Sequence, residues 1–182
     1  MANIKEFVAS FTNNGVNLAH ANRFSIEGGA TPGGWKGNSN LPLNQLIRDV
    51  NIGGKSLNTY IYRNIGTPVK MPYDIMNNEI ALTFMDTEFR DIYRFYTRWM
   101  REVYNDDDKE VGFGFYNDYT RDLHVFQHSK SITNPTYGVK YFNCYPIIIS
   151  DIAMSNESTN TWSTFTVTLV YETSIELVPK FK

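Results

Sequence analysis

Three short stretches carry residues whose type and spacing suggest chemistry, and each lacks something that the chemistry needs. Gly54-Lys55-Ser56 resembles the end of a phosphate-binding loop, but Asp49 stands where the earlier glycine belongs and a strand is predicted to follow. His124 and His128 would share a zinc ion on a helix, but in the strand predicted there they lie about 13 Å apart. The acidic run 106–108 lacks the alternating ligands of a calcium loop. We therefore expect no metal site and no cofactor.

Nucleophilic and acid–base chemistry have equally little support. The single cysteine, Cys144, lies in an apolar run beside Tyr145, so a nucleophile is not expected there. One cysteine also excludes an internal disulfide framework and suits a reducing compartment. Spacing alone leaves a pair of catalytic carboxylates open, but no pair stands out. We expect no catalytic residue, and hence no enzyme.

A row of four arginines is the one charged pattern with the spacing to bind anions. They recur every three or four residues and would share one face of a helix: Arg90, Arg94, Arg98 and Arg101. The same segment carries four carboxylates (Asp86, Glu88, Asp91 and Glu102), so its net charge is zero. Three interpretations stay open: a solvated surface, pairing with carboxylates of a neighbouring subunit through the planar guanidinium, or a grip on phosphates. The whole chain has 17 basic and 19 acidic residues, which argues against the third.

An amphipathic helix of about residues 87–104 is predicted to position these arginines. Apolar residues recur at three- and four-residue steps, the pattern of a helix with one buried face. The predicted core residues of that face are Phe89, Ile92, Tyr96 and Met100. Asp86 or Thr87 precedes it and offers a side-chain oxygen to the free amides of its first turn.

The remaining apolar pattern alternates with a period of two, which indicates short strands. Strands are predicted at 22–26, 56–63, 80–85, 111–115, 123–126 and 165–171, and over 141–149 with a start or bend at Pro146. The predicted fold class is mainly β: an antiparallel β-sandwich or barrel of about six to eight strands with one flanking helix. The predicted organisation is a single domain, 1–182, with an N-terminal arm (1–21) and long loops (28–40 and 53–78).

Composition favours an assembling protein. A chain of 21.0 kDa buries about 70% of its unfolded surface and so has a substantial core. Its 12 Tyr and 12 Phe exceed what that core needs, and oligomer interfaces are a common place to bury aromatic side chains. The two long loops carry only Lys36 and Lys55 as charges at their glycine-rich parts, and we expect them to contact other subunits. No apolar run approaches the ~18 residues of a membrane anchor.

Four stretches, in this order, resemble the tail tube proteins of contractile-tailed bacteriophages. They are Asn22–Ile26, Ile80–Asp86 followed by a helix containing Tyr96-Thr97-Arg98-Trp99, Tyr145-Pro146, and Phe165–Tyr171. The chain departs from the family at Met85, where Asn is frequent, at Tyr96, where Phe is usual, and in a longer glycine-rich loop. A baseplate or tube-initiating relative, or the tube of an injection apparatus, is the alternative within this resemblance.

The resemblance implies a structural role without catalytic residues. Six copies would form a ring, and rings would stack into a hollow tube that conducts DNA inside a sheath, with sheath and baseplate proteins as partners. The location implied is the virion tail, assembled in the host cytoplasm. Subunit contacts are expected at Lys36, Lys55, Arg90, Arg94, Arg98 and Arg101. The alternative from another class is a small-ligand-binding β-barrel, which would also be rich in aromatic residues.

Overall fold

The computed structural model describes residues 23–28, 43–63, 66–106, 111–128, 135–152, 154 and 162–177. The predictions for the arm 1–21, for nearly all of the loop 28–40 and for Lys36 lie outside these residues. The elements in chain order are β1 (Phe24–Gly28), α2 (Leu43–Leu46), β2 (Ile47–Asn51), β3 (Lys55–Tyr62), β4 (Val69–Asn77), β5 (Ile80–Met85), α3 (Asp91–Val103), β6 (Tyr104–Asn105), β7 (Gly112–Phe113), α4 (Tyr116–Tyr119), β8 (Arg121–His128), β9 (Pro135–Ile149), β10 (Thr164–Val170) and β11 (Thr173–Leu177).

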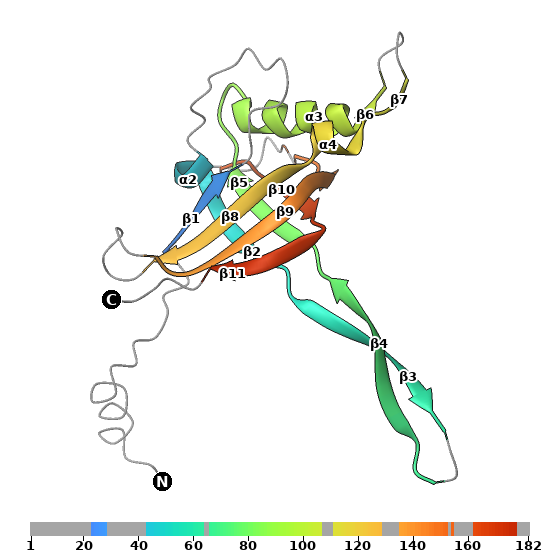
Figure 1. Ribbon diagram of the computed structural model, residues 1–182. Coiled ribbons are helices and arrows are strands. Elements are labelled where there is room, and N and C mark those ends of the chain that lie inside the picture. The colour runs from blue at the N-terminus through green and yellow to red at the C-terminus, as the bar shows by residue number, and fades with distance from the viewer. Residues whose placement is uncertain are drawn as a thin grey trace, which may run out of the picture.

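Seven strands form the antiparallel body of the molecule (Figure 1). They pair in the order β1-β8-β9-β10-β5-β2, and β11 pairs with β9 as well. The first part of β9 pairs with β8 and β11, and its last residues pair with β10, so this one strand belongs to both halves of a sandwich. The mainly β, antiparallel fold with one flanking helix is therefore confirmed; within the described residues the sheet does not close into a barrel.

The core follows from the period-two alternation. Ile80, Leu82 and Phe84 of β5 are fully buried, and so are Phe165, Val167 and Leu169 across the ladder in β10. Between them the outward face is polar: the hydroxyls of Thr83 and Thr166 lie 3.1 Å apart. One apolar and one polar face per strand fixes the pairing register, because a slip of one residue would expose the whole apolar set.

The long strand β9 is bent at Asn143, three residues before the predicted position. Asn143 has a left-handed backbone (φ 54°), and the pairing with β8 shifts register there, as a β-bulge requires. Its side-chain amide donates to the Glu172 carboxylate, and its backbone N–H donates to Asp122 Oδ1 at 3.4 Å. A second register shift, against β10, lies next to Pro146, where Ile147 is the extra residue. The irregularity predicted at Pro146 is thus present. The bulge at Asn143, which was not predicted, is the one with a left-handed backbone.

Helix α3 begins at Asp91, not near residue 87. Residues 87–90 form a turn in which Arg90 N donates to Thr87 O (2.9 Å), and Arg90 itself adopts a left-handed backbone (φ 54°, ψ 37°). The Thr87 hydroxyl accepts from the first helical amide, that of Asp91, at 3.2 Å. The predicted capping oxygen of Thr87 is therefore present, but it lies four residues before the amide that it caps, at the other end of the turn.

This late start changes which residues the helix buries. Ile92, Tyr96, Phe95 and Trp99 lie in the core, and Met100 is half-buried. The rings of Tyr96 and Phe84 are 5.4 Å apart, and Trp99 Nε1 donates to Tyr119 O at 2.6 Å. The prediction for Phe89 is wrong: its side chain is 71% exposed, because the turn ending at Arg90 places it before the helix.

Tyr96 is buried and Phe89 is exposed, so substitutions of these two aromatic residues make a matched pair. Tyr96→Ala should lower the free energy of unfolding by about 3–5 kcal/mol, because it leaves a cavity among packed rings. Phe89→Ala should change it by less than about 0.5 kcal/mol, because the side chain is exposed. Urea denaturation of the unassembled subunit measures both. Equal losses for the two variants would contradict the placement of Phe89.

The ion pair beside the β9 bend predicts a pH dependence. Lys140 Nζ lies 2.8 Å from Asp122 Oδ2, and this contact holds the pKa of the Asp122 carboxyl below its ordinary value. A depressed native pKa adds stability above the unfolded-state pKa of about 3.9, which is lost as the pH falls through the lower native pKa. Asp122→Asn should therefore cost less than about 1 kcal/mol near pH 7, because the pair is partly exposed.

The difference between the wild type and Asp122→Asn should shrink towards zero below about pH 4. Denaturant titrations at several pH values measure it, with Lys140→Met as the control that removes the same pair from the other side. A difference that stays constant down to pH 2 would show that the charge is irrelevant.

Candidate assembly interface

In the described segments, the side chains best suited to chemistry occupy buried or structural positions. Those segments hold no group of three or more His, Cys, Asp or Glu residues able to bind a metal ion. Cys144 is fully buried, and burial raises the pKa of its thiol to about 12. His128 Nε2 lies 2.7 Å from Ser25 Oγ, a contact that ties the end of β8 to β1. The distinctive features of the surface are instead exposed apolar side chains and unpaired cations.

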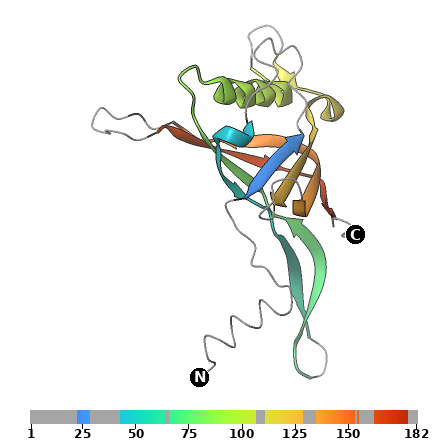
Figure 2. The same cartoon turned by 90° about the vertical axis from the view of Figure 1, so that its left-hand side faces the viewer.

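The most conspicuous surface is a two-stranded ribbon formed by β3 and β4, which projects away from the sandwich (Figures 1 and 2). Eight residues of β3 at about 3.3 Å each make it about 26 Å long. All of β4 is exposed, and nearly all of β3. Exposed large apolar side chains of this ribbon are Leu57, Tyr60, Ile61, Tyr62, Val69, Met71, Tyr73, Ile75 and Met76. An apolar surface of this size on a projection marks an interaction site.

The prediction of a long loop over 53–78 is wrong, because β3 and β4 take up most of it. The strand predicted over 56–63 is present as β3, but its partner β4 is not predicted, although Val69, Met71, Tyr73 and Ile75 alternate with a period of two. Pro72 concealed the signal, because proline removes a ladder donor. In the structure Pro72 faces Thr59 beside a shift of register, and a two-stranded ribbon leaves every outer edge open, so the missing donor is tolerated.

Contacts between the ends of its two strands close the base of the ribbon, and one hydrogen bond joins it to the body. A Cβ on Gly53 would lie 2.5 Å from the Asn78 carbonyl oxygen, so only glycine fits this close approach. Asn78 N donates to Gly54 O (3.0 Å), and Asn77 Nδ2 donates to Glu172 O (3.0 Å). The hydrogen bond between Asn77 and Glu172 thus connects the base of the ribbon to the turn between β10 and β11. Lys55, a predicted contact residue, stands exposed at this base.

The solvent face of α3 carries three of the four predicted arginines. At about 100° per residue, Arg94, Arg98 and Arg101 lie on the side opposite the buried aromatic residues. Arg94 and Arg101 are exposed and Arg98 is half-buried. None of the three forms an ion pair within the described part of the chain. The fourth, Arg90, is not on the helix and does not belong to this row.

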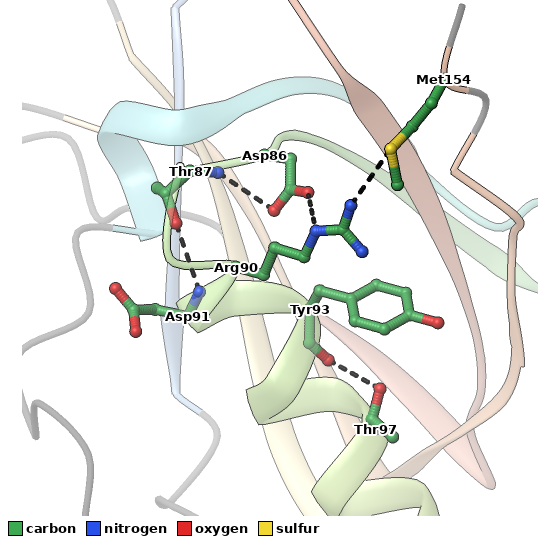
Figure 3. Close-up of polar contacts among 7 residues, drawn as sticks. All are labelled: Asp86, Thr87, Arg90, Asp91, Tyr93, Thr97 and Met154. Atoms are coloured by element: carbon green, nitrogen blue, oxygen red, sulfur yellow. Dashed lines mark hydrogen bonds and ion pairs between the residues drawn. The ribbon is translucent and has the colours of Figure 1, made fainter.

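Arg90 holds the turn that precedes the helix, as Figure 3 shows. Its Nε lies 3.7 Å from Asp86 Oδ2, and its Nη2 lies 3.5 Å from Met154 Sδ. Asp86 Oδ1 in turn accepts from Thr87 N at 3.0 Å. The left-handed backbone of Arg90 costs roughly 1–2 kcal/mol, which these contacts offset. Sequence patterns gave no sign of this conformation, since arginine shows no preference for it.

The turn displays an apolar patch, which we call the turn patch: Phe89, Met154 and Trp162. All three are more than 70% exposed. Met154 touches the Arg90 guanidinium, and Asp86 N donates to Ser163 O (2.8 Å), next to Trp162. The turn therefore gathers three chain segments at the N-terminal end of α3.

A second, shorter ribbon leaves the C-terminal end of α3. It consists of β6 and β7, whose rings Tyr104 and Phe113 lie 4.9 Å apart. Gly114 N donates to Val103 O (3.0 Å), and a Cβ on Gly114 would lie 2.3 Å from Glu102 O. The predicted strand over 111–115 is thus reduced to Gly112–Phe113, because the chain turns at Gly114 against the helix end and enters α4.

An open groove of about 560 Å³ lies at the other end of the sandwich, between β2 and β8. Phe24, Val50 and Tyr137 supply apolar walls, and the exposed ion pair of Arg48 with Asp49 (3.4 Å) lies at its rim. The polar side chain of Gln127 lines the groove as well. No helix in the described segments is long and apolar enough to cross a membrane.

Solved structures with a similar fold come from contractile injection systems. The sheath/tube terminator of an extracellular system (PVC, extended state) matches with a TM-score of 0.62 and 16% identity over 89% of this chain and 98% of that one. The PVC sheath–tube complex matches at 0.60 and 17% identity, over 88% and 92% of the two chains. The baseplate of the anti-feeding prophage matches at 0.63 and 11% identity, over 91% and 99%. Identities this low establish the fold alone.

No curated protein matches the sequence. The sequence model of the phage tail tube protein family matches residues 5–176, which is nearly the whole chain. That match covers both projecting ribbons, the arginine face of α3 and the strands that carry them. The chain therefore belongs to the phage tail tube protein family.

Proposed function

We propose that this chain is a structural, non-enzymatic subunit of a contractile tail, and that six copies form a ring whose stacking builds the hollow inner tube that conducts DNA. Sheath and baseplate proteins are its partners, and the site of action is the virion tail after assembly in the host cytoplasm. Family membership supports a tail-tube role. The observation that carries the assembly is the β3–β4 ribbon with its nine exposed apolar side chains.

The energetic argument is that the ribbon needs a partner. Burying one such side chain stabilises an interface by about 1.5–3 kcal/mol. Association costs at least about 4 kcal/mol in lost freedom, so a few of the nine residues suffice to offset it. The hydrogen bond between Asn77 and Glu172 at its base restrains the direction of the ribbon before it binds. A projection of this shape suits contact with a subunit in an adjacent ring.

A tube terminator or baseplate subunit is the second candidate. The fold is as similar to a sheath/tube terminator and a baseplate as to a sheath–tube complex, with nearly complete coverage of each of those chains. The two roles differ in whether growth continues. A tube subunit alone, concentrated in buffer, should form stacks of many rings, whereas a terminator or baseplate subunit should stop at one or two rings. Negative-stain electron microscopy of the purified chain separates them.

The first prediction of this proposal concerns the ribbon. Tyr73→Lys combined with Ile75→Lys should abolish stacking, because two charged side chains would replace apolar contacts worth about 3–6 kcal/mol per subunit. The monomer should stay folded, since both side chains are exposed. Light scattering after size exclusion, with electron microscopy, measures the assembly state. The matched control is Ser56→Lys with Thr59→Lys, which adds the same charge to polar positions of the same ribbon.

Stacks of normal length from the Tyr73→Lys, Ile75→Lys variant would contradict the role of the ribbon. Loss of stacking in the control as well would show only that added charge is harmful.

The second prediction concerns the channel. A conduit for DNA works only if its wall does not hold the cargo, since each phosphate that Lys or Arg neutralises releases counterions and adds affinity. We expect a neutral or negative lumen, with the α3 arginines on the outer wall or against a neighbouring subunit. Assembled tubes should therefore not retain duplex DNA in filter binding at ~50 mM salt, where electrostatic attraction is weakly screened. Tight binding that disappears when Arg94, Arg98 and Arg101 are replaced by Gln would place the helix in the channel.

A further inference from the structure

We propose that the β3–β4 ribbon of one subunit binds the groove between β2 and β8 of a second copy of this chain in the adjacent ring. This inference rests on the proposed stacking through the ribbon and adds the surface that receives it. The contact joins the half of one ribbon that lies farther from its body, its distal half, to the base of the next ribbon.

The groove lies where the sheet does not close on itself. Strands β1 and β2 are the two ends of the pairing order, and within the described residues they do not pair with each other. We call the gap between them the seam. Helix α2 bridges one end of the seam, since Asn44 Oδ1 accepts from Ile26 N at 2.6 Å. The groove occupies the other end, between Phe24 of β1 and Val50 of β2, where the inner residues of the sandwich are reached from outside.

The walls of the groove are apolar and incompletely covered. Phe24, Val50 and Tyr137 are half-buried, and Ile52 is 43% exposed. Apolar surface of this kind gains free energy when another apolar surface covers it. Gln127 and Asp49 lie among these walls, and their side-chain oxygens can accept hydrogen bonds. A suitable occupant is therefore mainly apolar and carries a few hydroxyl groups.

One face of the distal half of the ribbon has this composition. In the pairing of β3 with β4, Tyr60 lies opposite Met71. Two positions farther from the base, on the same face, Tyr62 lies opposite Val69. The Tyr60 hydroxyl donates to Met71 Sδ (3.7 Å), and the ring of Tyr73 lies 6.2 Å from that of Tyr60. All five side chains are at least 40% exposed, and tyrosine is a frequent anchor residue of protein interfaces.

The positions of the ribbon and the groove favour a contact between copies. In Figure 1 the ribbon leaves the body towards the lower right, whereas β1 and the end of β8 lie at the left. The ribbon is about 26 Å long, so its distal half lies away from the groove of its own subunit. Ile52 of the groove comes just before β3, so the groove adjoins the base of the ribbon.

A contact between the distal half of one ribbon and the base of the next uses two different surfaces of the same chain. Such a heterologous interface leaves one free surface of each kind at the two ends of every assembly, so growth continues instead of stopping at a dimer. This is the behaviour that the stacking of many rings requires.

A cross-link between two different chains tests the contact. One chain carries Tyr62→Cys in the ribbon, and the other carries Ile52→Cys in the groove; the native Cys144 is fully buried. After co-assembly, a short bis-maleimide should join the two chains into dimers on denaturing gels. The yield should be at least about tenfold above that of either chain alone, because a linker attached beside its target reacts at a high effective concentration. The matched control replaces Ile52→Cys with Arg94→Cys, an exposed position of α3, and should give only the background yield.

A groove variant tests the same contact without a cross-linker. Ile52→Lys with Gln127→Lys should lower the population of stacks in electron microscopy by at least about tenfold, because the apolar face of the ribbon would meet two charges. The control is Ile175→Lys with Asn117→Lys, which adds the same charge at an exposed isoleucine and an exposed amide outside the groove and both ribbons. This control should stack like the wild type. Far-ultraviolet circular dichroism and urea titration verify that each variant is folded.

The outcomes separate this inference from the proposed function. Wild-type chain that forms no stacks would refute the proposed stacking, and this contact with it. If the wild type stacks, equal dimer yields from the Ile52→Cys and Arg94→Cys mixtures, or normal stacks from the folded groove variant, would overturn the groove contact while stacking stands. A sheath or baseplate protein would then be the candidate occupant of the groove, and its binding to the wild type but not to the groove variant would establish it.

Discussion

The packing of α3 on the sandwich is the interaction on which the remaining structure depends. Four of its side chains lie in the core, and the ring of Tyr96 packs on Phe84 of β5 while Trp99 donates to the chain entering β8. Substituting one such aromatic residue costs several kcal/mol, a large part of the 5–15 kcal/mol that stabilise an ordinary domain. Once the inner face is fixed, the outer face and both helix ends are fixed too. The arginines follow from the helix alone, whereas the turn patch and the β6–β7 ribbon are also held by local contacts of Arg90 and Gly114.

Strand β9 is connected to the base of the β3–β4 ribbon through Glu172. Because it passes from β8 to β10 between Cys144 and Tyr145, just after the bulge at Asn143, the two halves of the sandwich meet along one strand. Asn143 and Phe142 both bind Glu172, and the Glu172 carbonyl accepts from Asn77 at the base of β3–β4. A single bulge thus connects the bend of the sheet to the direction of a ribbon that projects from the body. This is consistent with the general role of bulges in re-aiming chain segments.

The elements with strong periodicity were predictable from the sequence. The strands over 80–85 and 165–171, the helix and the antiparallel class followed from apolar spacing, because burial on one face is what that spacing encodes. The turn at Arg90 and the bulge at Asn143 were not predictable. Both are left-handed conformations of residues other than glycine, maintained by contacts with Met154 and Glu172, which lie far away in sequence. The prediction for Phe89 is wrong for the same reason. Its spacing fits the buried face of the helix, but the helix begins only at Asp91, two residues after Phe89.

The hairpin β3–β4 was missed for a different reason, and that reason bears on function. Strand assignment from sequence assumes that one face of the strand is buried within the chain, whereas the apolar residues of β4 have no core to face. In the described residues the apolar side chains of this ribbon pack against no core, which is why we propose that they form an assembly contact. The sandwich buries its own apolar faces, whereas the two ribbons leave theirs exposed. In the proposed assembly, folding and association would therefore use separate sets of residues, and a subunit would reach its native structure before it met the growing end of a tube.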